Sequence, residues 1–445
     1  MSDYRISDYT YFCRDNGQML FINTLNKNLM YSDETSRIQH ILDNLSTGGL
    51  SETDQGILDS LLKNGFIIVH DYDEKTIAQK RYWDEVYDSR LGITVMPTEQ
   101  CNCRCPYCYE SFSKPHMDDK TVEALLSFLG KNLIRYTGLN ISWFGGEPLL
   151  ALEVVEKISK KVLEMCRVRH IMYDSSITTN GVLLTPEVFR KLLNCRISRF
   201  QITLDGPKAT HDQTRVLRNG KGTFDTIINN LIAIKNSRAS AIRVNVRINV
   251  TKQTLNMLPE FIEFLSDTFG DDKRFSFYFR PIGDWDHNIE EGTLKDSLLP
   301  SLEAVYKILL ENPRKLNYGI LYQLLLSSMC YANKRNHFVL GSDGTVYKCT
   351  VYFNENINKV GKLTPNGVID WDEEKLAKWI NNDFSASKCK TCFLAATCHG
   401  KGCPAKELIY GQKAGCGHEF ENVSNILKLL YQSNNFHHYY KKLEV

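Results

Sequence analysis

The sequence predicts an α/β fold: a partial (β/α)6 barrel with an N-terminal winged-helix-like module and a C-terminal cysteine-rich domain. Six apolar, strand-like runs alternate with amphipathic helical stretches between residues 91 and 280, which indicates parallel strands joined by right-handed crossovers. Seven of the fourteen cysteines lie in the last third of the chain, and four more lie within eight residues of one another. We place the three parts at residues 1–85, 86–285 and 330–445, with bridging helices at 286–329.

The N-terminal module begins with a predicted hairpin. Asn16-Gly17 stands between two apolar runs within residues 9–22, and this dipeptide favours a tight turn between antiparallel strands. Apolar residues then recur at helical spacing from Ile38 to Leu45. A first helix is therefore expected directly after the hairpin.

A second helix of the module is expected to start at Ser51, which forms a capping-box pattern with Asp54 and ends before Gly65. A strand at 66–69 and a connecting helix within 71–90 follow. Winged-helix modules often bind DNA, but phosphate binding needs basic residues. The face around the second helix is instead acidic, with Glu52, Asp54 and Asp59.

The barrel pattern occupies residues 86–285. The expected strands are 91–97, 139–144, 172–178, 198–204, 241–250 and 274–280, with helices at 118–136, 150–168, 186–194, 223–236 and 256–268. In β/α barrels the chemistry lies at the C-terminal ends of the strands, so functional residues are expected there. One C-terminal helix is expected at 421–442.

Composition excludes several classes of protein. Lys and Arg total 54 and Asp and Glu total 52, a balance that gives no support to a nucleic-acid or membrane partner. No apolar run reaches the roughly 18–20 residues that span a bilayer, and the N-terminus lacks a signal-peptide profile. We therefore expect a cytoplasmic protein, in which clustered cysteines bind metal rather than form disulfides.

The first cysteine cluster follows the first barrel strand as Cys101-x3-Cys105-x2-Cys108. Three thiolates on a tight loop can hold three irons of a [4Fe–4S] cluster and leave the fourth iron free of protein ligands. An open position is what a metal centre needs to bind a small molecule. Cys103 could also be a ligand in principle, but alternate residues on so short a loop do not converge easily on one metal.

Four further motifs lie at predicted strand ends, in chain order. Glycines admit close backbone approach, and carbonyls with a carboxylate suit an ammonium group. A guanidinium suits a carboxylate because it binds both oxygens together. The motifs are Gly145-Gly146-Glu147-Pro148, Thr178-Thr179-Asn180-Gly181, the set Gln201, Thr203 and Asp205, and Arg215.

Together these motifs resemble those of radical S-adenosylmethionine (radical SAM) enzymes. The resemblance implies that Cys101, Cys105 and Cys108 hold a [4Fe–4S] cluster and that SAM binds its open iron. It further implies that SAM is split into methionine and a 5′-deoxyadenosyl radical, which abstracts a hydrogen atom from the substrate. The residues implied to contact SAM are Tyr107, Gly145, Gly146, Glu147, Thr179, Asn180, Gln201, Thr203, Asp205 and Arg215.

The C-terminal cysteines resemble the SPASM extension of this family, an iron–sulfur domain with two auxiliary [4Fe–4S] clusters, which makes three clusters in all. The resemblance assigns one cluster to Cys389, Cys392, Cys398 and Cys416, and the other to Cys330, Cys349 and Cys403. Four residues separate Cys398 from Cys403, where the family usually has three. No further cysteine lies between Cys330 and Cys349, so the inner cluster has an open iron or a ligand from elsewhere.

The winged-helix-like module indicates the substrate class, because it resembles the precursor-recognition element of peptide maturases. Such elements bind a leader peptide as an added strand at a sheet edge. The leading hypothesis is an enzyme that installs an intramolecular cross-link, a thioether or a carbon–carbon bond, in a ribosomally synthesised precursor peptide. A flavodoxin- or ferredoxin-type protein would supply the electron. The sequence assigns no general base, although Glu110 and Asp284 lie near strand or loop ends.

Two alternatives remain open at the level of sequence. An anaerobic sulfatase maturase, which oxidises cysteine or serine to formylglycine, shares the barrel and the cysteine pattern but usually lacks the N-terminal module. A non-catalytic, zinc-stabilised peptide-binding scaffold would also account for the Cys-x2-Cys pair.

Overall fold

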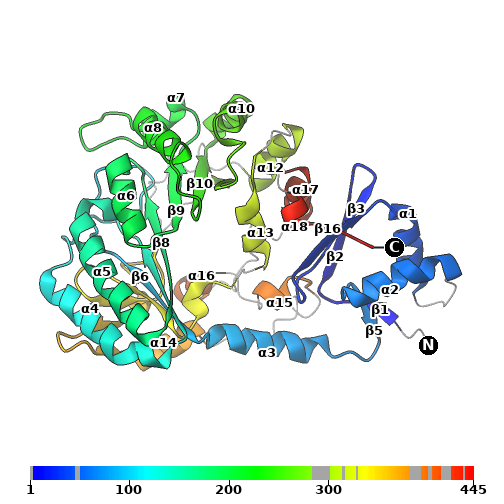
Figure 1. Ribbon diagram of the computed structural model, residues 1–445, viewed down its shortest axis with the longest axis horizontal. Coiled ribbons are helices and arrows are strands. Elements are labelled where there is room, and N and C mark those ends of the chain that lie inside the picture. The colour runs from blue at the N-terminus through cyan, green and yellow to red at the C-terminus, as the bar shows by residue number, and fades with distance from the viewer. Residues whose placement is uncertain are drawn as a thin grey trace.

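The computed structural model describes residues 4–45, 51–282, 301–312, 316–326, 329–380, 392–398, 403–411, 422–433 and 436–444. The predicted cluster ligands Cys389 and Cys416 lie outside the described residues, as does Asp284. Figure 1 shows the barrel sheet and its helices at one end of the molecule, the N-terminal module at the other, and the long helix α3 (Glu74–Val86) between them.

The six predicted barrel strands all form and all pair in parallel. They lie in sequence order across the sheet, with consecutive strands as hydrogen-bonded neighbours. In the middle strands buried apolar residues alternate with partly exposed polar ones, as in Leu139, Ile141 and Trp143 or Phe200, Ile202 and Leu204. The strands are β6 (Arg90–Val95), β7 (Gly138–Trp143), β8 (Met172–Thr179), β9 (Arg199–Leu204), β10 (Arg243–Val250) and β11 (Phe275–Pro281).

The five helices predicted from the apolar periodicity also form between these strands, whereas two short helices at 208–214 and 252–255 were not predicted. Several begin at a side chain that caps the first turn: Asp118 accepts a hydrogen bond from Thr121 N–H, and Thr185 accepts one from Val188 N–H. The helices are α4 (Asp119–Asn132), α5 (Leu152–Arg169), α6 (Pro186–Asn194), α7 (Lys208–Thr214), α8 (Phe224–Lys235), α9 (Lys252–Leu255) and α10 (Leu258–Phe269). Figure 1 shows α4, α5 and α6 covering the outer face of the sheet.

The sheet continues beyond the barrel into the cysteine-rich region, which the sequence did not predict. Strand β12 (His337–Leu340) pairs in parallel with β6, and Met96 N–H donates to the Leu340 carbonyl at 2.9 Å. Antiparallel strands β13 (Thr345–Tyr347), β14 (Lys359–Leu363) and β15 (Ile369–Trp371) extend it further. Among the described residues, ten strands thus form one sheet, which joins the barrel to the region of the C-terminal cysteines.

The N-terminal module contains the predicted hairpin, the two helices and the strand after them. The hairpin strands are β2 (Thr10–Asp15) and β3 (Gln18–Asn23), and Asn16 and Gly17 take the positive φ angles of 46° and 84° that this tight turn needs. Ser51 and Asp54 make the expected capping box. The helices are α1 (Thr35–Asn44), the 3₁₀ turn Glu52–Asp54 and α2 (Gln55–Lys63), and β5 (Ile67–Val69) pairs with β1 (Tyr4–Ile6).

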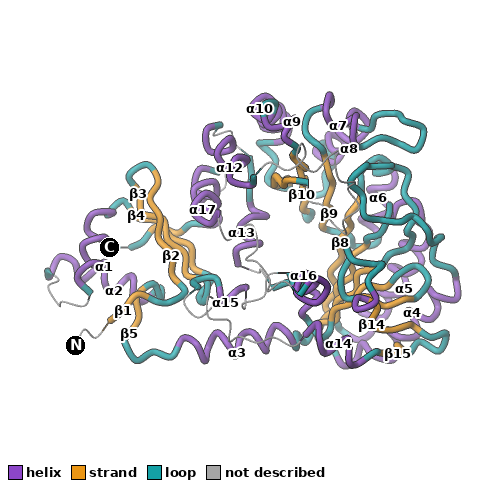
Figure 2. The backbone as a smooth tube through the Cα atoms, turned by 180° about the vertical axis from the view of Figure 1, so that it is seen from behind, coloured by secondary structure: helices purple, strands orange, loops and turns teal. Residues whose placement is uncertain are grey.

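A third strand, β4 (Asn28–Ser32), pairs with β3 and extends the sheet of the hairpin. This strand was not predicted. Its outer edge is covered by β16 (Lys441–Lys442), which comes from the end of the chain and runs parallel to β4. The sheet order is β16-β4-β3-β2. Figure 2 shows this sheet from the other side, with the C-terminus next to it.

The expected single helix over 421–442 is wrong. The structure has α17 (Val423–Gln432), α18 (Phe436–Tyr439) and then β16, because Ser433 takes an extended conformation with φ −73° and ψ 155°. Serine competes for backbone hydrogen bonds and disfavours helix interiors. Other described helices are α12 (Leu302–Glu311), α13 (Gly319–Leu326), α14 (Glu373–Ile380), α15 (Ala395–Cys398) and α16 (Pro404–Tyr410).

No helix within the described part of the chain is both long enough and apolar enough to cross a bilayer.

Candidate functional site

The first cysteine cluster lies on a loop that follows β6 and is held against residues 216–218. Arg104 N–H donates to the Val216 carbonyl at 2.9 Å, and Arg218 N–H donates to the Asn102 carbonyl at 3.0 Å. Cys101 and Cys103 are buried, while Cys105 and Cys108 are partly exposed. The loop is therefore fixed by main-chain bonds to the segment that carries Arg215.

The three predicted ligand thiols influence one another electrostatically, which places them in one neighbourhood. Hydrogen bonds from the Cys103 thiol and amide, with the positive charge of Arg215, lower the pKa of Cys101 to about 6. Burial, with the charges of Cys105, Glu110 and Cys101, raises the pKa of Cys108 to about 12. Burial also raises the pKa of the Cys105 thiol. Cys101 is thus the thiol most readily ionised for metal ligation.

No group of three or more His, Cys, Asp or Glu side chains in the described ranges is placed to hold one metal ion. A four-iron cluster differs from a single ion, because each thiolate ligates a different iron. The described cysteines are all free thiols. Three such thiols on one eight-residue loop are the donor set that a [4Fe–4S] cluster takes, and Cys101, Cys105 and Cys108 would hold it.

The glycines of the predicted Gly-Gly-Glu-Pro motif pack against the segment that leads into this loop. A Cβ atom at Gly146 would lie 2.6 Å from the Glu99 carbonyl oxygen, and one at Gly145 would meet the Thr98 carbonyl oxygen. Gly145 also has a φ of 108°, which favours glycine. Glu147 N–H donates to the Gln100 carbonyl at 2.8 Å. The two glycines therefore permit a close approach, but the group that approaches them is the chain's own backbone rather than a ligand.

The Glu147 carboxylate is fully buried and holds the end of β8. It accepts hydrogen bonds from the Thr179 hydroxyl at 2.8 Å, from Asn180 N–H at 2.7 Å and from Leu149 N–H at 3.0 Å. Burial raises the pKa of Glu147 to about 7 despite these donors. Asn180 then donates from its side chain to the Asn102 amide oxygen at 2.7 Å and toward Cys101 Sγ at 3.7 Å. The motifs Gly145–Pro148 and Thr178–Gly181 thus support the cysteine loop directly.

A second network surrounds Tyr107, whose hydroxyl donates to the Asp205 carboxylate. Arg215 Nη1 donates to the Tyr107 hydroxyl at 3.1 Å and lies 3.8 Å from Asp205 Oδ1. Thr214 donates to Asp205 at 2.7 Å, and Asn249 donates to it at 3.0 Å. Asp205, Arg215 and the cysteine loop therefore form one polar cluster.

One buried donor of this cluster, on Arg215, is left without a protein partner in the described part of the chain. Arg215 Nε is buried and has no hydrogen-bond partner among the described residues, and the same is true of Glu110 Oε1 in the cysteine loop. A buried guanidinium with a free N–H costs free energy unless an anion completes it. The methionine carboxylate of SAM is such an anion, so the residues present fit this cofactor.

Gln201 and Thr203 lie on β9 below this cluster. The Tyr278 hydroxyl on β11 donates to Gln201 Oε1 at 2.9 Å, and Thr203 is level with Arg247 on β10. Arg247 Nε donates to Asn249 Oδ1 at 2.9 Å. Asn249 and Arg247 were not predicted, although their place at the C-terminal end of a barrel strand is the signal that could have found them.

His211 is another residue that the sequence reasoning missed. Its Nδ1 accepts a hydrogen bond from Asp205 N–H at 3.1 Å, so its proton lies on Nε2, which donates to the Thr223 hydroxyl at 2.9 Å. Thr223 in turn donates to the Arg215 carbonyl at 2.6 Å. Burial lowers the pKa of His211 to about 4, with a further lowering effect from Arg215. Neutral His211 therefore positions both Asp205 and Arg215.

The C-terminal cysteines divide into a described set and an undescribed one. Burial, with charge on Cys403, raises the pKa of Cys330 to about 11. Burial, with charge on Cys330 and Cys403, raises the pKa of Cys349 to about 12. These three thiols, assigned to the inner auxiliary cluster, therefore lie near one another. Of the outer set, Cys392 and Cys398 are described, with Ala395 N–H bonded to the Cys392 carbonyl at 2.9 Å.

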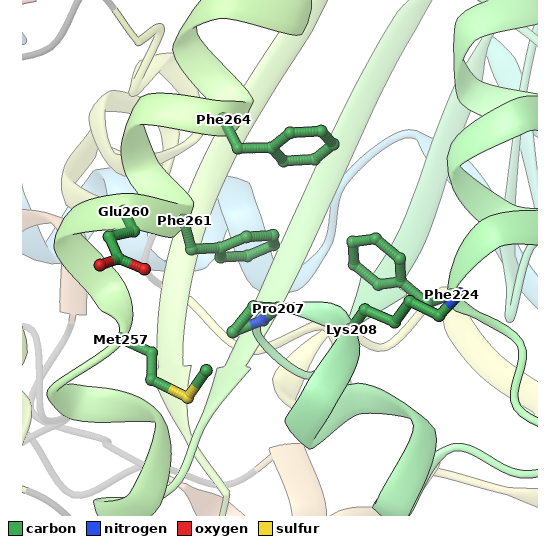
Figure 3. Close-up of a pocket in the computed structure, with 7 residues that line it drawn as sticks. All are labelled: Pro207, Lys208, Phe224, Met257, Glu260, Phe261 and Phe264. Carbon is green, nitrogen blue, oxygen red and sulfur yellow. The ribbon is translucent and has the colours of Figure 1, made fainter.

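A shallow hollow of about 230 Å³ lies elsewhere, on the outer helices α7, α8 and α10. Figure 3 shows Phe224, Phe261 and Phe264 around it, with Lys208 at one side. Lys208 is already paired with Asp225. None of the predicted ligands lines this hollow, so it is not the candidate site.

Comparison with known proteins agrees with this geometry. Residues 95–265 match the model of the Radical SAM superfamily. The chain is similar to the mycofactocin maturase MftC of Mycolicibacterium smegmatis, at 25% identity over 73% of this chain and 80% of that protein. It is also similar to a cysteine-type anaerobic sulfatase-maturating enzyme of Clostridium perfringens, at 24% identity over 70% of this chain and 88% of that protein.

Two solved structures share the fold. Native anSMEcpe with bound AdoMet and Kp18Cys peptide superimposes with a TM-score of 0.58 and 20% identity, over 77% of this chain and 97% of that one. Streptococcus suis SuiB bound to precursor peptide SuiA superimposes with a TM-score of 0.52 and 15% identity, over 92% of this chain and 97% of that one.

Proposed function

We propose that this protein is a radical SAM maturase that installs an intramolecular cross-link, a thioether or a carbon–carbon bond, in a ribosomally synthesised precursor peptide. The match of residues 95–265 to the Radical SAM superfamily supports an enzyme, and the similar proteins include a mycofactocin maturase and an anaerobic sulfatase-maturating enzyme. The finer assignment depends on the part of the chain outside the barrel.

The observation that carries the cross-link assignment is the N-terminal module. The likeness to SuiB bound to its precursor peptide spans 92% of this chain, whereas the likeness to anSMEcpe spans 77%. Residues 4–45 and 51–86 form a strand-and-helix module with its own buried cluster, which includes Phe21, Ile38 and Phe66. A module of this kind next to a radical SAM domain suits the recognition of a leader peptide.

The chain's own residues would bind and position the cofactor. When bound, the cluster and SAM supply a 5′-deoxyadenosyl radical that abstracts a hydrogen atom from the peptide. Arg215 would hold the SAM carboxylate through its free Nε, while Tyr107 and Asp205 fix the direction of the guanidinium. Glu147 and Asn180 hold the cysteine loop in place beside that site.

The inner auxiliary set would serve the later oxidation step. The resemblance assigns Cys330, Cys349 and Cys403 to this set without a fourth cysteine, and burial together with the charges of Cys330 and Cys403 raises the pKa of Cys349. A substrate thiolate could complete such a set, which favours the thioether over the carbon–carbon bond. Together with the outer set and the cluster at Cys101, Cys105 and Cys108, this would make three [4Fe–4S] clusters, reduced by a flavodoxin- or ferredoxin-type donor.

The test is co-expression with a short peptide encoded by a neighbouring reading frame, followed by mass spectrometry. A cross-link by loss of two hydrogen atoms lowers the peptide mass by about 2 Da and survives reduction. The matched control is the Cys105→Ala variant, which should leave the peptide unmodified. An unmodified peptide with the wild-type enzyme, despite SAM cleavage, would contradict the assignment.

Anaerobic sulfatase maturation is the second candidate, because anSMEcpe gives the higher TM-score, 0.58 against 0.52. A sulfatase-derived peptide with a central cysteine distinguishes the two functions. Formylglycine formation on that peptide, with no change in the neighbouring peptide, supports sulfatase maturation. Iron and sulfide analysis tests the zinc-scaffold alternative: about twelve irons per chain supports three clusters, and zinc alone supports the scaffold.

A further inference from the structure

The N-terminal sheet has two edges, and the chain's own C-terminus occupies one of them. Lys441 and Lys442 lie beside Met30 and Tyr31 of β4, parallel to that strand. Leu443 N–H donates to the Tyr31 carbonyl at 2.9 Å. A strand edge pairs readily with any extended segment, and here the segment comes from the opposite end of the sequence.

One side chain anchors this segment. Leu443 is 2% exposed and belongs to the core of the N-terminal module, where it packs in the cluster that contains Met19, Phe21 and Met30. The flanking residues Lys441, Lys442 and Glu444 are exposed. Lys442 adds an ion pair to Asp33 at 2.7 Å, in which both side chains are about half exposed. The edge therefore receives an extended segment with a lysine followed by a buried apolar residue.

Residues 441–444 can leave the β4 edge without moving helix α17. Tyr440 is buried, and its hydroxyl donates to the Leu427 carbonyl of α17 at 2.9 Å. Tyr431 of α17 packs on Tyr31 with ring centroids 5.3 Å apart and donates a hydrogen bond to Gln18. These contacts hold α17 and Tyr440 on the sheet independently of residues 441–444. A swing at Tyr440 would expose the β4 edge and the Leu443 site.

We propose that the β4 edge is an exchangeable strand-binding site, and that residues 441–443 are its resident occupant, which a peptide partner displaces. The partner is an extended peptide that carries a basic residue followed by an apolar one and enters parallel to β4. The identification of this peptide as the leader of the modified precursor rests on the proposed function. The exchange of strands at the β4 edge does not depend on that function.

The experiment uses the full-length, cluster-loaded protein and a fluorescent peptide of this chain's own last six residues, Tyr440 to Val445. The Leu443→Asp variant should release the resident segment, because a carboxylate cannot occupy an apolar core without a partner. Fluorescence anisotropy should then show at least tenfold tighter peptide binding to Leu443→Asp than to the wild type. The Glu444→Gln variant, altered at an exposed position, is the matched control and should behave as the wild type.

A peptide with aspartate in place of its leucine should bind neither protein. Equal binding of the leucine peptide to the wild type and to Leu443→Asp, or binding to neither, would overturn the proposal. If Leu443→Asp fails to fold, a chain that ends at Tyr440 takes its place, with the same expected result.

A second measurement separates this proposal from the proposed function. With a precursor that becomes cross-linked, Leu443→Asp should lower KM for the peptide and leave kcat unchanged. Tight binding of the tail peptide without any precursor modification would retain the exchangeable edge and reject the maturase. Precursor modification with an unchanged KM, together with no binding of the tail peptide, would retain the maturase and reject the exchangeable edge.

Discussion

The Tyr107 hydroxyl donates a hydrogen bond to the Asp205 carboxylate, which joins the cysteine loop to the C-terminal end of β9. Arg215 donates to the same hydroxyl at 3.1 Å, and Asn249 contacts both partners. One phenol thus connects the loop after β6 with β9, β10 and the segment that carries Arg215. Its loss should affect cofactor binding more than overall folding.

Tyr107→Phe should weaken SAM binding about tenfold, equivalent to about 1.4 kcal/mol, because the direction of Arg215 is no longer fixed. Isothermal titration of SAM into the anaerobically reconstituted protein measures this. Tyr318→Phe is the control, since that tyrosine is buried but takes no part in the hydrogen bonds around Tyr107, Asp205 and Arg215. Equal affinity in Tyr107→Phe and wild type would contradict the assigned role.

Gly146→Ala should displace the segment before Cys101 and reduce the iron content of the purified protein. The new Cβ would lie 2.6 Å from the Glu99 carbonyl oxygen, and backbone atoms there cannot rotate away. Overpacking of this kind costs about 1–3 kcal/mol of unfolding free energy. Chemical denaturation and iron analysis of the same samples measure both effects.

The matched control for this change is Gly130→Ala. Gly130 lies in α4, and a Cβ there meets no atom within 4 Å. This substitution should raise the free energy of unfolding by roughly 0.5–1 kcal/mol, because alanine favours the helix. If both variants lose iron equally, glycine content rather than the clash with residues 99–100 would be responsible.

His211 should make the folded state less stable as the pH falls. Its pKa is about 4 in the folded protein, against about 6.5 in an unfolded chain, because burial disfavours the charged form. Between these values the unfolded chain binds more protons, so stability is complete above pH 6.5 and decreases toward pH 4. The total change from this group is on the order of 3 kcal/mol.

His211→Asn tests this directly, because the asparagine amide oxygen can still accept the hydrogen bond from Asp205 N–H. Urea denaturation at several pH values should give a shallower decrease for the variant than for the wild type between pH 6.5 and 4. SAM affinity at pH 7.5 should be reduced by no more than a few-fold. An unchanged pH dependence would show that another group is responsible.

Cys105→Ala should abolish SAM cleavage without unfolding the chain, because Cys105 is partly exposed on the loop and lies outside the main core. Deoxyadenosine is quantified by liquid chromatography after reduction with dithionite. Cys195→Ala removes a buried core thiol far from the motif in sequence and should retain cleavage. Persistent deoxyadenosine in Cys105→Ala would remove that thiol from the ligand set.

The parallel barrel strands could be predicted because each is a local apolar run bounded by an amphipathic helix. Strand β12 could not be, because its partner β6 lies more than 240 residues earlier and pairing over such a separation leaves no local pattern. The same holds for β16, which contains two lysines and is a strand only because β4 is beside it. Non-local pairing was the main limit of the sequence reasoning.

The candidate site, like the fold, was predicted only in part from the sequence. The motif residues were predicted from the resemblance to radical SAM enzymes, and the structure brings three of them, Tyr107, Asp205 and Arg215, into one network. His211 was missed because a histidine inside a helix more often fills a core than positions a ligand. The tasks of Gly145 and Glu147 were only partly foreseen, because their partners are backbone atoms that only the folded chain brings near.

Leu443 completes the core of a module whose other buried members lie within residues 19–67, so it is translated more than 370 residues after them. A ribosome adds roughly 5–20 residues per second, so this module waits tens of seconds for that apolar contact. During that interval the β4 edge of the nascent protein is open to other extended chains, including a peptide translated nearby. Translation that stops before Leu443 would therefore leave a defect in the N-terminal module, far in sequence from the missing residues.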